Sequence, residues 1–245
     1  MADNFDALVN LWPQFVDGIL VTLQLTIGGS VLAFILAATL GITARHQNIV
    51  MRGGARMFIE FFRGTSLLVQ LFWLFYVLPL VFPGLFDNRQ VASLVCGIAA
   101  LGLNYGAYGA EVVRGAINAV PTGQWEASVA LSLSPRRRMF RIVWPQAWAI
   151  MIPSLSNLGI MLLKGSAVAF VIFMHDITFV SGVLRQRTND TFFSYGVGML
   201  MYFLIAYVLV LIANFAEVHA KNRLGAGPPL KTIFRPRAAK PSAVS

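Results

Sequence analysis

Residues 191–216 read TFFSYGVGMLMYFLIAYVLVLIANFA, a run of 26 residues without a single Asp, Glu, Lys or Arg. Its length exceeds the roughly 18 apolar residues that indicate a helix able to cross a bilayer. Four more uncharged runs of at least 21 residues occur at 18–44, 64–86, 90–110 and 142–163. None of them alternates apolar and polar residues as the strands of a membrane barrel do. We therefore expect an all-α integral membrane protein with five transmembrane helices.

The composition agrees with a lipid environment. Of the 245 residues, 57% are apolar and 12% are charged, about half the charged fraction usual for soluble domains. The single cysteine, Cys96, excludes a disulfide framework within one chain. The charged residues before the first uncharged run are all acidic, whereas a signal peptide begins with basic residues. This run is therefore expected to be a retained span. We expect one membrane domain over 1–224 and a disordered tail over 225–245.

The basic residues are distributed unequally between the two ends of the expected helices. Fourteen Lys and Arg residues fall in loops on one side, and three fall on the other. Because loops rich in Lys and Arg stay in the cytoplasm, we expect the N-terminus outside and the C-terminus in the cytoplasm. The net charge of +9 is then explained by topology and by attraction to anionic membrane lipid. Nucleic acid is not an expected partner.

The longest cytoplasmic loop, about residues 114–146, contains signals for two short helices. Thr122 indicates the first helix start as its cap residue, and Ser134 with Pro135 indicates the second. An apolar stripe at i, i+4 and i+8 runs along the first helix: Trp125, Val129 and Leu133. Pro145 is expected to end the loop. These residues leave two interpretations open, an amphipathic element on the bilayer surface or a docking element for a soluble partner.

The spacing within this loop resembles the EAA loop of binding-protein-dependent ABC importers. That family pattern is Glu-Ala-Ala, three residues, Gly, nine residues, Ile, one residue and Leu-Pro. The present chain keeps the spacing in full, with Ser128, Ser132 and Trp144 in place of the second Ala, the Gly and the Leu. The resemblance implies that the loop docks into a groove of an ATPase subunit. The residues to which it assigns docking are Gly123, Glu126, Ala127, Ser128, Leu131, Ser132, Ile142 and Pro145.

Further segments resemble the polar amino-acid permeases of the histidine/glutamine type, and the resemblance covers about residues 18–220. The segments are 62–70, 103–108, 111–115, 123–127 and 162–164. The resemblance implies a type I ABC importer permease fold with five transmembrane helices in the bacterial cytoplasmic (inner) membrane. It also implies three kinds of protein partner: ABC ATPase subunits, an extracytoplasmic solute-binding protein and a second permease chain, either a copy or a sister chain.

No signature for nucleotide hydrolysis is found in the chain. A P-loop needs Gly, four residues and then Gly-Lys-Ser/Thr, whereas the nearest match, at 225–232, has Leu230 in place of the second Gly. We therefore expect no catalytic residue and no cofactor, with ATP hydrolysis in a separate subunit. The three histidines all fall at the ends of expected spans, so neither a metal site nor a haem between helices is expected.

One face of the fourth expected helix carries polar residues, which in a membrane face protein or a water-filled cavity. The residues of this face are Ser154, Asn157, Met161 and Lys164. They are candidates for the translocation path, where the Lys164 cation would attract a substrate carboxylate, with Asp176 as its partner or as a second wall group. The alternative is that Lys164 reaches the outer surface and Asn157 bonds a neighbouring helix. The apolar segment 165–175 is too short to cross alone and is either re-entrant or an external half-helix.

Two resemblances leave the substrate class open. The first implies a polar amino acid, while residues 162–167 and 176–179 also resemble permeases for ectoine and hydroxyectoine, which are zwitterionic amino-acid derivatives. Three other function classes are alternatives. A secondary transporter would depend on an ion gradient instead of ATP, a channel would not need the EAA loop, and a membrane redox subunit would need histidine pairs inside its spans.

Overall fold

The computed structural model describes residues 2–82 and 88–223, and within these ranges the chain is helical with no strand. The expected all-α fold is confirmed. In chain order the elements are α1 (Ala2–Thr43), α2 (Ile49–Gly64), α3 (Leu67–Phe72), η1 (Trp73–Val77), α4 (Leu78–Val81), α5 (Arg89–Asn118), α6 (Thr122–Ala130), α7 (Pro135–Arg138), η2 (Met139–Val143), α8 (Trp144–Ser166), η3 (Ala167–Ile172), α9 (Ile177–Thr188) and α10 (Thr191–Arg223). The tail over 225–245, including the incomplete P-loop match, lies outside the described residues.

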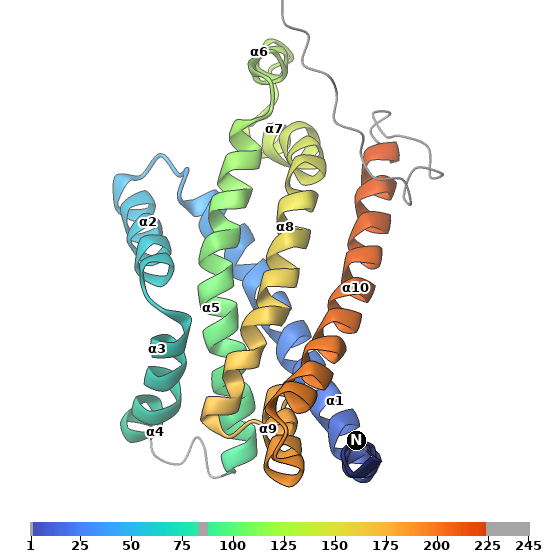
Figure 1. The fold of residues 1–245 in the computed structure, drawn as a ribbon. Coiled ribbons are helices and arrows are strands. Elements are labelled where there is room, and N and C mark those ends of the chain that lie inside the picture. The colour runs from blue at the N-terminus through green and yellow to red at the C-terminus, as the bar shows by residue number, and fades with distance from the viewer. Residues whose placement is uncertain (1, 83–87, 224–245) are drawn as a thin grey trace, which may run out of the picture.

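Helix α5 is the centre of the molecule. In its most apolar stretch 56% of the residues are buried inside the chain, against 6% for α10. In Figure 1, α2, α3 and α4 lie on one side of α5, and α8 and α10 lie on the other. Helix α1 crosses α5 at close range because Gly41 has no Cβ, and a Cβ there would lie 2.8 Å from the carbonyl oxygen of Ala110. Helix α10, in contrast, leaves most of its apolar surface uncovered.

The two ends of the molecule carry different elements (Figure 1). The short helices α6 and α7 lie at one end together with the last turns of α10, and the N-terminus, α4 and α9 lie at the other end. The arginine-rich helix α7 and the start of α2, which contains Arg52 and Arg56, belong to the first end. The two ends therefore differ in charge in the same sense as the loops of the sequence.

Four helices are long and apolar enough to cross a membrane, and the bent pair of α2 with α3–α4 would make a fifth. The sequence predicted the second span over 64–86; within this run the chain is helical from Leu67 to Val81, and it bends by 102° at residues 65–66, just before that helix. Residues 67–81 extend about 22 Å at 1.5 Å per residue, which is short of the ~30 Å hydrocarbon core. The absence of charged residues shows that a segment is apolar, but it does not show where the chain bends.

Two π-helical turns precede prolines inside otherwise continuous helices. Turn η1 ends two residues before Pro79, and η2 ends two residues before Pro145. Because proline has no N–H, the carbonyl four residues earlier loses its usual partner. A π turn, in which the Trp144 N–H donates to the Met139 carbonyl, accommodates this mismatch. Pro145 therefore lies inside one helical span, Pro135–Ile172, and does not end the loop as expected.

The segment between α8 and α10 packs at the end of the molecule that carries the N-terminus. Helix α8 continues into the 3₁₀ turn η3, which stops at Phe173, a residue with a left-handed φ of 63°. Helix α9 follows and buries Val180 and Leu184 against the N-terminal part of α1. Of residues 165–175, which the sequence left as either re-entrant or an external half-helix, 165–172 continue the α8 span through η3, and α9 is a separate helix that begins at Ile177.

Candidate functional site

Helix α6 begins three residues after α5 and lies beyond its end (Figure 1). The residue in the N-cap position is Pro121, and Thr122 is already helical, so the expected Thr122 cap is wrong. The Gln124 N–H instead donates to the Pro121 carbonyl at 3.0 Å. Proline and its extended ψ of 138° therefore define the start of the helix, because a fixed φ orients the first helical turn.

A tight turn centred on Ser132 ends α6. The Ser132 N–H donates to the Val129 carbonyl at 2.8 Å, and the Leu133 N–H donates to the Ser128 carbonyl at 3.2 Å. This pair of bonds is the Schellman motif, in which the residue after the cap is left-handed. Ser132 has a φ of 53°, where a side chain costs about 1 kcal/mol relative to glycine. The turn explains why the EAA pattern has Gly at this position.

Most of α6 is exposed. Glu126 and Ala127 are accessible, and two apolar side chains, Val129 and Leu131, are 55% and 71% exposed. Ser128 is fully buried, and its hydroxyl donates to the Trp125 carbonyl at 2.6 Å. Of the expected apolar stripe, Trp125 and Leu133 are half-buried and Val129 is exposed, and the inner face continues from Trp125 to Ser128. Large apolar side chains exposed on one short helix indicate a surface that a partner covers.

The remaining docking candidates continue from α6 into the start of the α8 span. Gly123 is exposed in the first turn of α6, Ile142 is half-buried in η2, and Pro145 is exposed at the start of α8. The Gln146 amide nitrogen lies 3.4 Å from the Gln124 side-chain oxygen. This contact joins α6 to α8, so the candidates belong to one connected surface and not to two separate helices.

A cation–π contact connects the end of α1 to the same loop. The Arg45 guanidinium carbon lies 5.5 Å from the centroid of the Trp125 ring. Burial and, secondarily, the charge of Arg114 lower the pKa of Arg45 from its ordinary value, although arginine stays protonated in proteins. Trp125 also packs on the apolar cluster that includes Val113 and Val143. Sequence reasoning assigned Arg45 only to topology, because nothing in the chain order indicates its contact with residue 125.

The polar face of α8 is exposed along its whole length. The residues that share this face, all exposed, are Ile150, Ser154, Asn157, Met161 and Lys164. Their 4-3-4-3 spacing is the spacing at which one helix packs against another. Ile150 extends the predicted set toward the end that carries α6. The face is open in the single chain, so its neighbours come from outside the chain.

Asp176 lies in a different environment from this face. It is fully buried, and its carboxylate accepts the Phe179 N–H and the Tyr202 hydroxyl, each at 3.0 Å. It is the N-cap of α9, a role that suits a carboxylate because the helix N-terminus is electropositive. Lys164 is exposed, so the structure does not bring these two residues together on one open surface. Among residues 2–82 and 88–223, no group of three or more His, Cys, Asp and Glu residues is suited to hold a metal ion.

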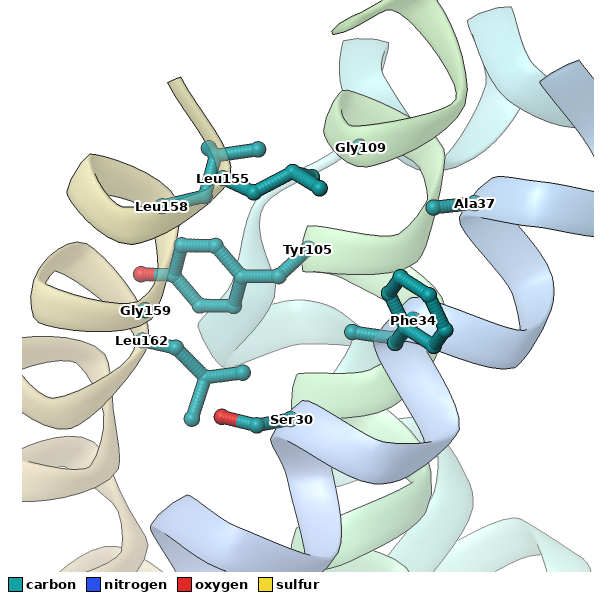
Figure 2. A pocket seen from close by; sticks show the side chains of 10 residues that line it. Ser30, Phe34, Ala37, Tyr105, Gly109, Leu155, Leu158, Gly159 and Leu162 are labelled. Atoms are coloured by element: carbon teal, nitrogen blue, oxygen red, sulfur yellow. The ribbon is translucent and has the colours of Figure 1, made fainter. Parts of the chain in front are cut away.

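An apolar cavity of about 230 Å³ lies between α1, α5 and α8. Figure 2 shows the Tyr105 ring extending from α5 toward α8, with Phe34 and Ser30 of α1 on the opposite wall. The Tyr105 hydroxyl donates to the Met161 carbonyl at 2.9 Å. The cavity is smaller than the roughly 300 Å³ at which ligand sites begin, and its walls are almost entirely apolar. It therefore cannot hold a charged solute.

Residues 29–225 match the family described as the binding-protein-dependent transport system inner membrane component. The chain belongs to this family. It is therefore the membrane component of a binding-protein-dependent ABC importer, a transport subunit and not an enzyme, and a separate subunit hydrolyses ATP. The resemblance of the EAA loop is confirmed at the level of the family.

Several curated relatives are similar over most of their length. The chain is 42% identical over 200 residues to the Sinorhizobium fredii protein named "Probable amino-acid ABC transporter permease protein y4tF", with 82% of this chain and 84% of the relative covered. It is 31% identical over 209 residues to the "L-cystine transport system permease protein TcyB" of Bacillus subtilis, with 85% and 87% covered. These identities extend the family relationship beyond the loop over 114–146 to the long apolar helices.

Solved structures share the fold. A chain of the crystal structure of "an amino acid ABC transporter with histidines" superposes with a TM-score of 0.77 at 29% identity, covering 87% of this chain and 97% of that one. A chain of the inward-facing MetNI methionine ABC transporter superposes with a TM-score of 0.72 at 17% identity, covering 86% and 98%. The second likeness concerns the fold alone. The arrangement of helices in Figure 1 is thus an ABC importer permease fold.

The left-handed turn predicts opposite effects for two substitutions of Ser132. Ser132→Gly should stabilise the loop by about 1 kcal/mol, since glycine adopts a positive φ without a steric penalty. Ser132→Val should destabilise it by more, because a β-branched residue is poorly tolerated at positive φ. Hydrogen exchange of the amides of α6 measures the change. Slower exchange in the valine variant than in the glycine variant would contradict the assigned turn.

Proposed function

We propose that α6 and the turn that follows it are the part of this importer subunit that docks onto the ATPase. The observation that carries the proposal is the exposed surface of α6, where Glu126 and Ala127 lie beside the apolar side chains of Val129 and Leu131. A groove in a partner would cover these apolar groups, and the Glu126 carboxylate would pair with a donor there. The remaining members of the docking set are Gly123, Ser128, Ser132, Ile142 and Pro145. Ser128 is buried, so its part in docking would be to support α6 from its inner face.

The orientation that fits this role has α6 in the cytoplasm. Five crossings follow when the bent pair α2 with α3–α4 counts as one span, with the N-terminus outside and the C-terminal end of α10 inside. The location of the arginine-rich helix α7 beside α6 supports this orientation, since basic loops remain in the cytoplasm. The membrane is the bacterial inner membrane, in keeping with the family. Residues 1–224 form its single domain.

The translocation path of this proposal lies between this chain and a second permease chain. The cavity between α1, α5 and α8 is too small and too apolar for a charged solute, while the polar face of α8 is open. Pairing that face with a second chain would enclose Ser154, Asn157, Met161 and Lys164 in a polar passage. Lys164 would attract the substrate carboxylate. Asp176, buried as the cap of α9, would hold the outer wall in shape.

In the proposed cycle the ATPase supplies the motion and the chain transmits it. ATP binding would close the ATPase pair and move α6, and α5 and the α8 span would follow because the contacts of Trp125 and Gln124 connect α6 to their ends. The helices would then open toward the binding protein outside. None of these steps forms or breaks a covalent bond in this chain.

The proposed substrate class is polar amino acids. The names of the curated relatives concern amino acids and cystine, and the solved amino-acid transporter is 29% identical. Ectoine and hydroxyectoine, which also carry a carboxylate and a cationic nitrogen, are the second candidates, with no better support from these relatives. Lys164 serves either class because it recognises only the carboxylate that they share.

Glu126→Lys should abolish ATP-dependent uptake while the protein remains in the membrane. The reversed charge removes the proposed pairing with the ATPase groove and adds repulsion there. Co-purification of the ATPase subunits and substrate uptake into vesicles are the measurements. Asp6→Lys, an exposed charge reversal at the opposite end of the molecule, is the control and should keep the ATPase bound. Normal uptake by Glu126→Lys would refute the docking assignment.

The proposed path predicts nucleotide-dependent labelling of α8. Asn157→Cys in a Cys96→Ser background should react with a membrane-impermeant thiol reagent, and ATP should change the rate, because the passage opens and closes during the cycle. Leu204→Cys, at an exposed apolar position of α10, is the matched control and should stay unreactive in lipid. Equal, nucleotide-independent reactivity at both positions would argue against a path along α8.

The substrate class is tested on the binding protein that works with this chain. Thermal shift measurements against amino acids, ectoine and hydroxyectoine should show stabilisation by at least one amino acid, since a ligand that binds the native state raises its melting temperature. Uptake of the same compound by the reconstituted transporter confirms the match. Stabilisation by ectoine alone would replace the amino-acid assignment.

A further inference from the structure

The bend between α2 and α3 brings the carbonyl end of α2 against α5. A helix leaves the carbonyls of its last four residues without partners inside the helix. In α2 these residues are 61–64, and the next helix leaves at an angle of 102°. Because lipid offers no hydrogen bonds, such carbonyls need partners from the protein. Gly64 does not force the bend, since a Cβ there would meet no atom within 4 Å.

Side chains provide partners for three of these four carbonyls. The Phe61 carbonyl accepts the Thr65 hydroxyl at 2.8 Å. The Phe62 carbonyl accepts two amides, the Gln70 side chain at 2.9 Å and the Asn104 side chain at 3.1 Å. The Tyr108 hydroxyl donates to the Arg63 carbonyl at 3.3 Å. The end of α2 is therefore held by α3 through Gln70 and by α5 through Asn104 and Tyr108.

The two amides are well shielded. Gln70 is 7% exposed and Asn104 is 6% exposed, so their hydrogen bonds act where the dielectric constant is low and each bond is stronger than in water. Tyr108 adds a second contact, because the Arg63 guanidinium carbon lies 5.5 Å from the centroid of its ring. Arg63 also pairs with Glu60 at 3.3 Å. The last turn of α2 is thus bound from several directions at once.

Helix α5 connects these bonds to the docking loop. It carries Asn104 and Tyr108 near its middle, and it leads into α6 only three residues after its last turn. A rigid helix transmits a shift at one end to groups along its length. We propose that Gln70, Asn104 and Tyr108 form a carbonyl latch that makes the bend between α2 and α3 follow the motion that α5 receives from α6. This inference rests on the proposed coupling of α6 to an ATPase.

Two buried polar atoms at the bend between α2 and α3 form no hydrogen bond with any residue that the structure describes. Within the described residues, the side-chain oxygen of Gln70 and the Nε of Arg63 are buried and have no hydrogen-bond partner. A buried polar atom without a partner is costly, and in a native protein it calls for an explanation. One acceptor and one donor left over at the bend allow a second arrangement of the latch to form bonds that are absent here. The bend is therefore suited to two positions and not only to one.

The latch also explains why two separated segments of the sequence occur together. Gln70 ends the segment 62–70, and Asn104 and Tyr108 belong to the segment 103–108. The first segment contains the carbonyls and one amide, and the second contains the other donors. Neither segment forms the latch alone, because the Phe62 carbonyl accepts one hydrogen bond from Gln70 in the first segment and one from Asn104 in the second. Gln70, Asn104 and Tyr108 are positioning residues, since they act on the backbone of α2 and not on the substrate.

The test uses the complete transporter with its ATPase subunits and binding protein in lipid vesicles. The variants are Gln70→Met, Asn104→Leu and Tyr108→Phe, with Gln24→Met and Tyr207→Phe as matched controls at exposed positions. Each latch variant should lower the number of substrates moved per ATP by about fivefold, the value of one hydrogen bond, while ATPase binding stays unchanged. The double variant Gln70→Met/Asn104→Leu should be less than additive, because both amides bind one carbonyl. The controls should match the wild type.

Spin labels measure the bend directly. Met57→Cys on α2 and Leu80→Cys on α4, both highly exposed, are labelled in a Cys96→Ser background. ATP should shift the distance between the labels in the wild type, and the latch variants should lose this shift or broaden the distribution. A structural role alone would lower the yield of folded protein without removing the shift from the fraction that folds. Asn104→Gln, which keeps a donor, should restore part of the coupling.

Tyr108→Phe covers the case in which the amide variants fail to assemble, because it removes only a hydroxyl and keeps the ring over Arg63. If this variant transports with wild-type coupling and shows the wild-type distance shift, the latch is overturned. Failure of the wild type to transport any amino acid or ectoine would overturn the substrate proposal instead. The label distances depend on nucleotide and not on the substrate, so the two failures can be told apart.

Discussion

Every backbone polar group at membrane depth needs a partner from the protein, and the structure of this chain follows from that requirement. Long helices meet it by their own i→i+4 bonds. The described chain departs from regular α-helix at two π turns that precede prolines, at the 3₁₀ turn η3 and at the bend after Gly64. At the π turn before Pro145 a change of helical register takes up the released group, and at the bend side-chain amides and hydroxyls bond three of the four end carbonyls of α2.

The same requirement makes α5 more than a packing element. Its small residues let α1 approach closely, and its polar residues face the carbonyl end of α2 instead of lipid. Asn104 and Tyr108 are thus stabilised by the carbonyls that they satisfy, and the bend of α2 depends on them. Because α5 also leads into α6, one helix connects the loop that contains α6 with the bend between α2 and α3.

The interior of the chain and its open face differ in chemistry. The cavity between α1, α5 and α8 is apolar (Figure 2), whereas the exposed face of α8 carries Ser154, Asn157 and Lys164. The apolar walls of the first offer a hydrophilic solute few hydrogen-bond partners, whereas the second presents a hydroxyl, an amide and a cation. This difference is the basis for the proposed passage between two permease chains, in which the exposed face of α8 would be one wall.

The sequence by itself determined the apolar helices, the charge difference between the two ends and the family, through the spacing of the EAA loop. These features are local or additive, so they can be read along the chain. It misplaced the cap of α6, and it gave no sign of the bend before α3, because a cap and a bend depend on which neighbours are present. Only the tertiary structure decided that Asp176 is a buried cap while Lys164 is open, and that Gln70 and Asn104 meet at one carbonyl. Residues 34 positions apart in sequence can share one hydrogen-bond acceptor only once the packing of α2, α3 and α5 has brought them together.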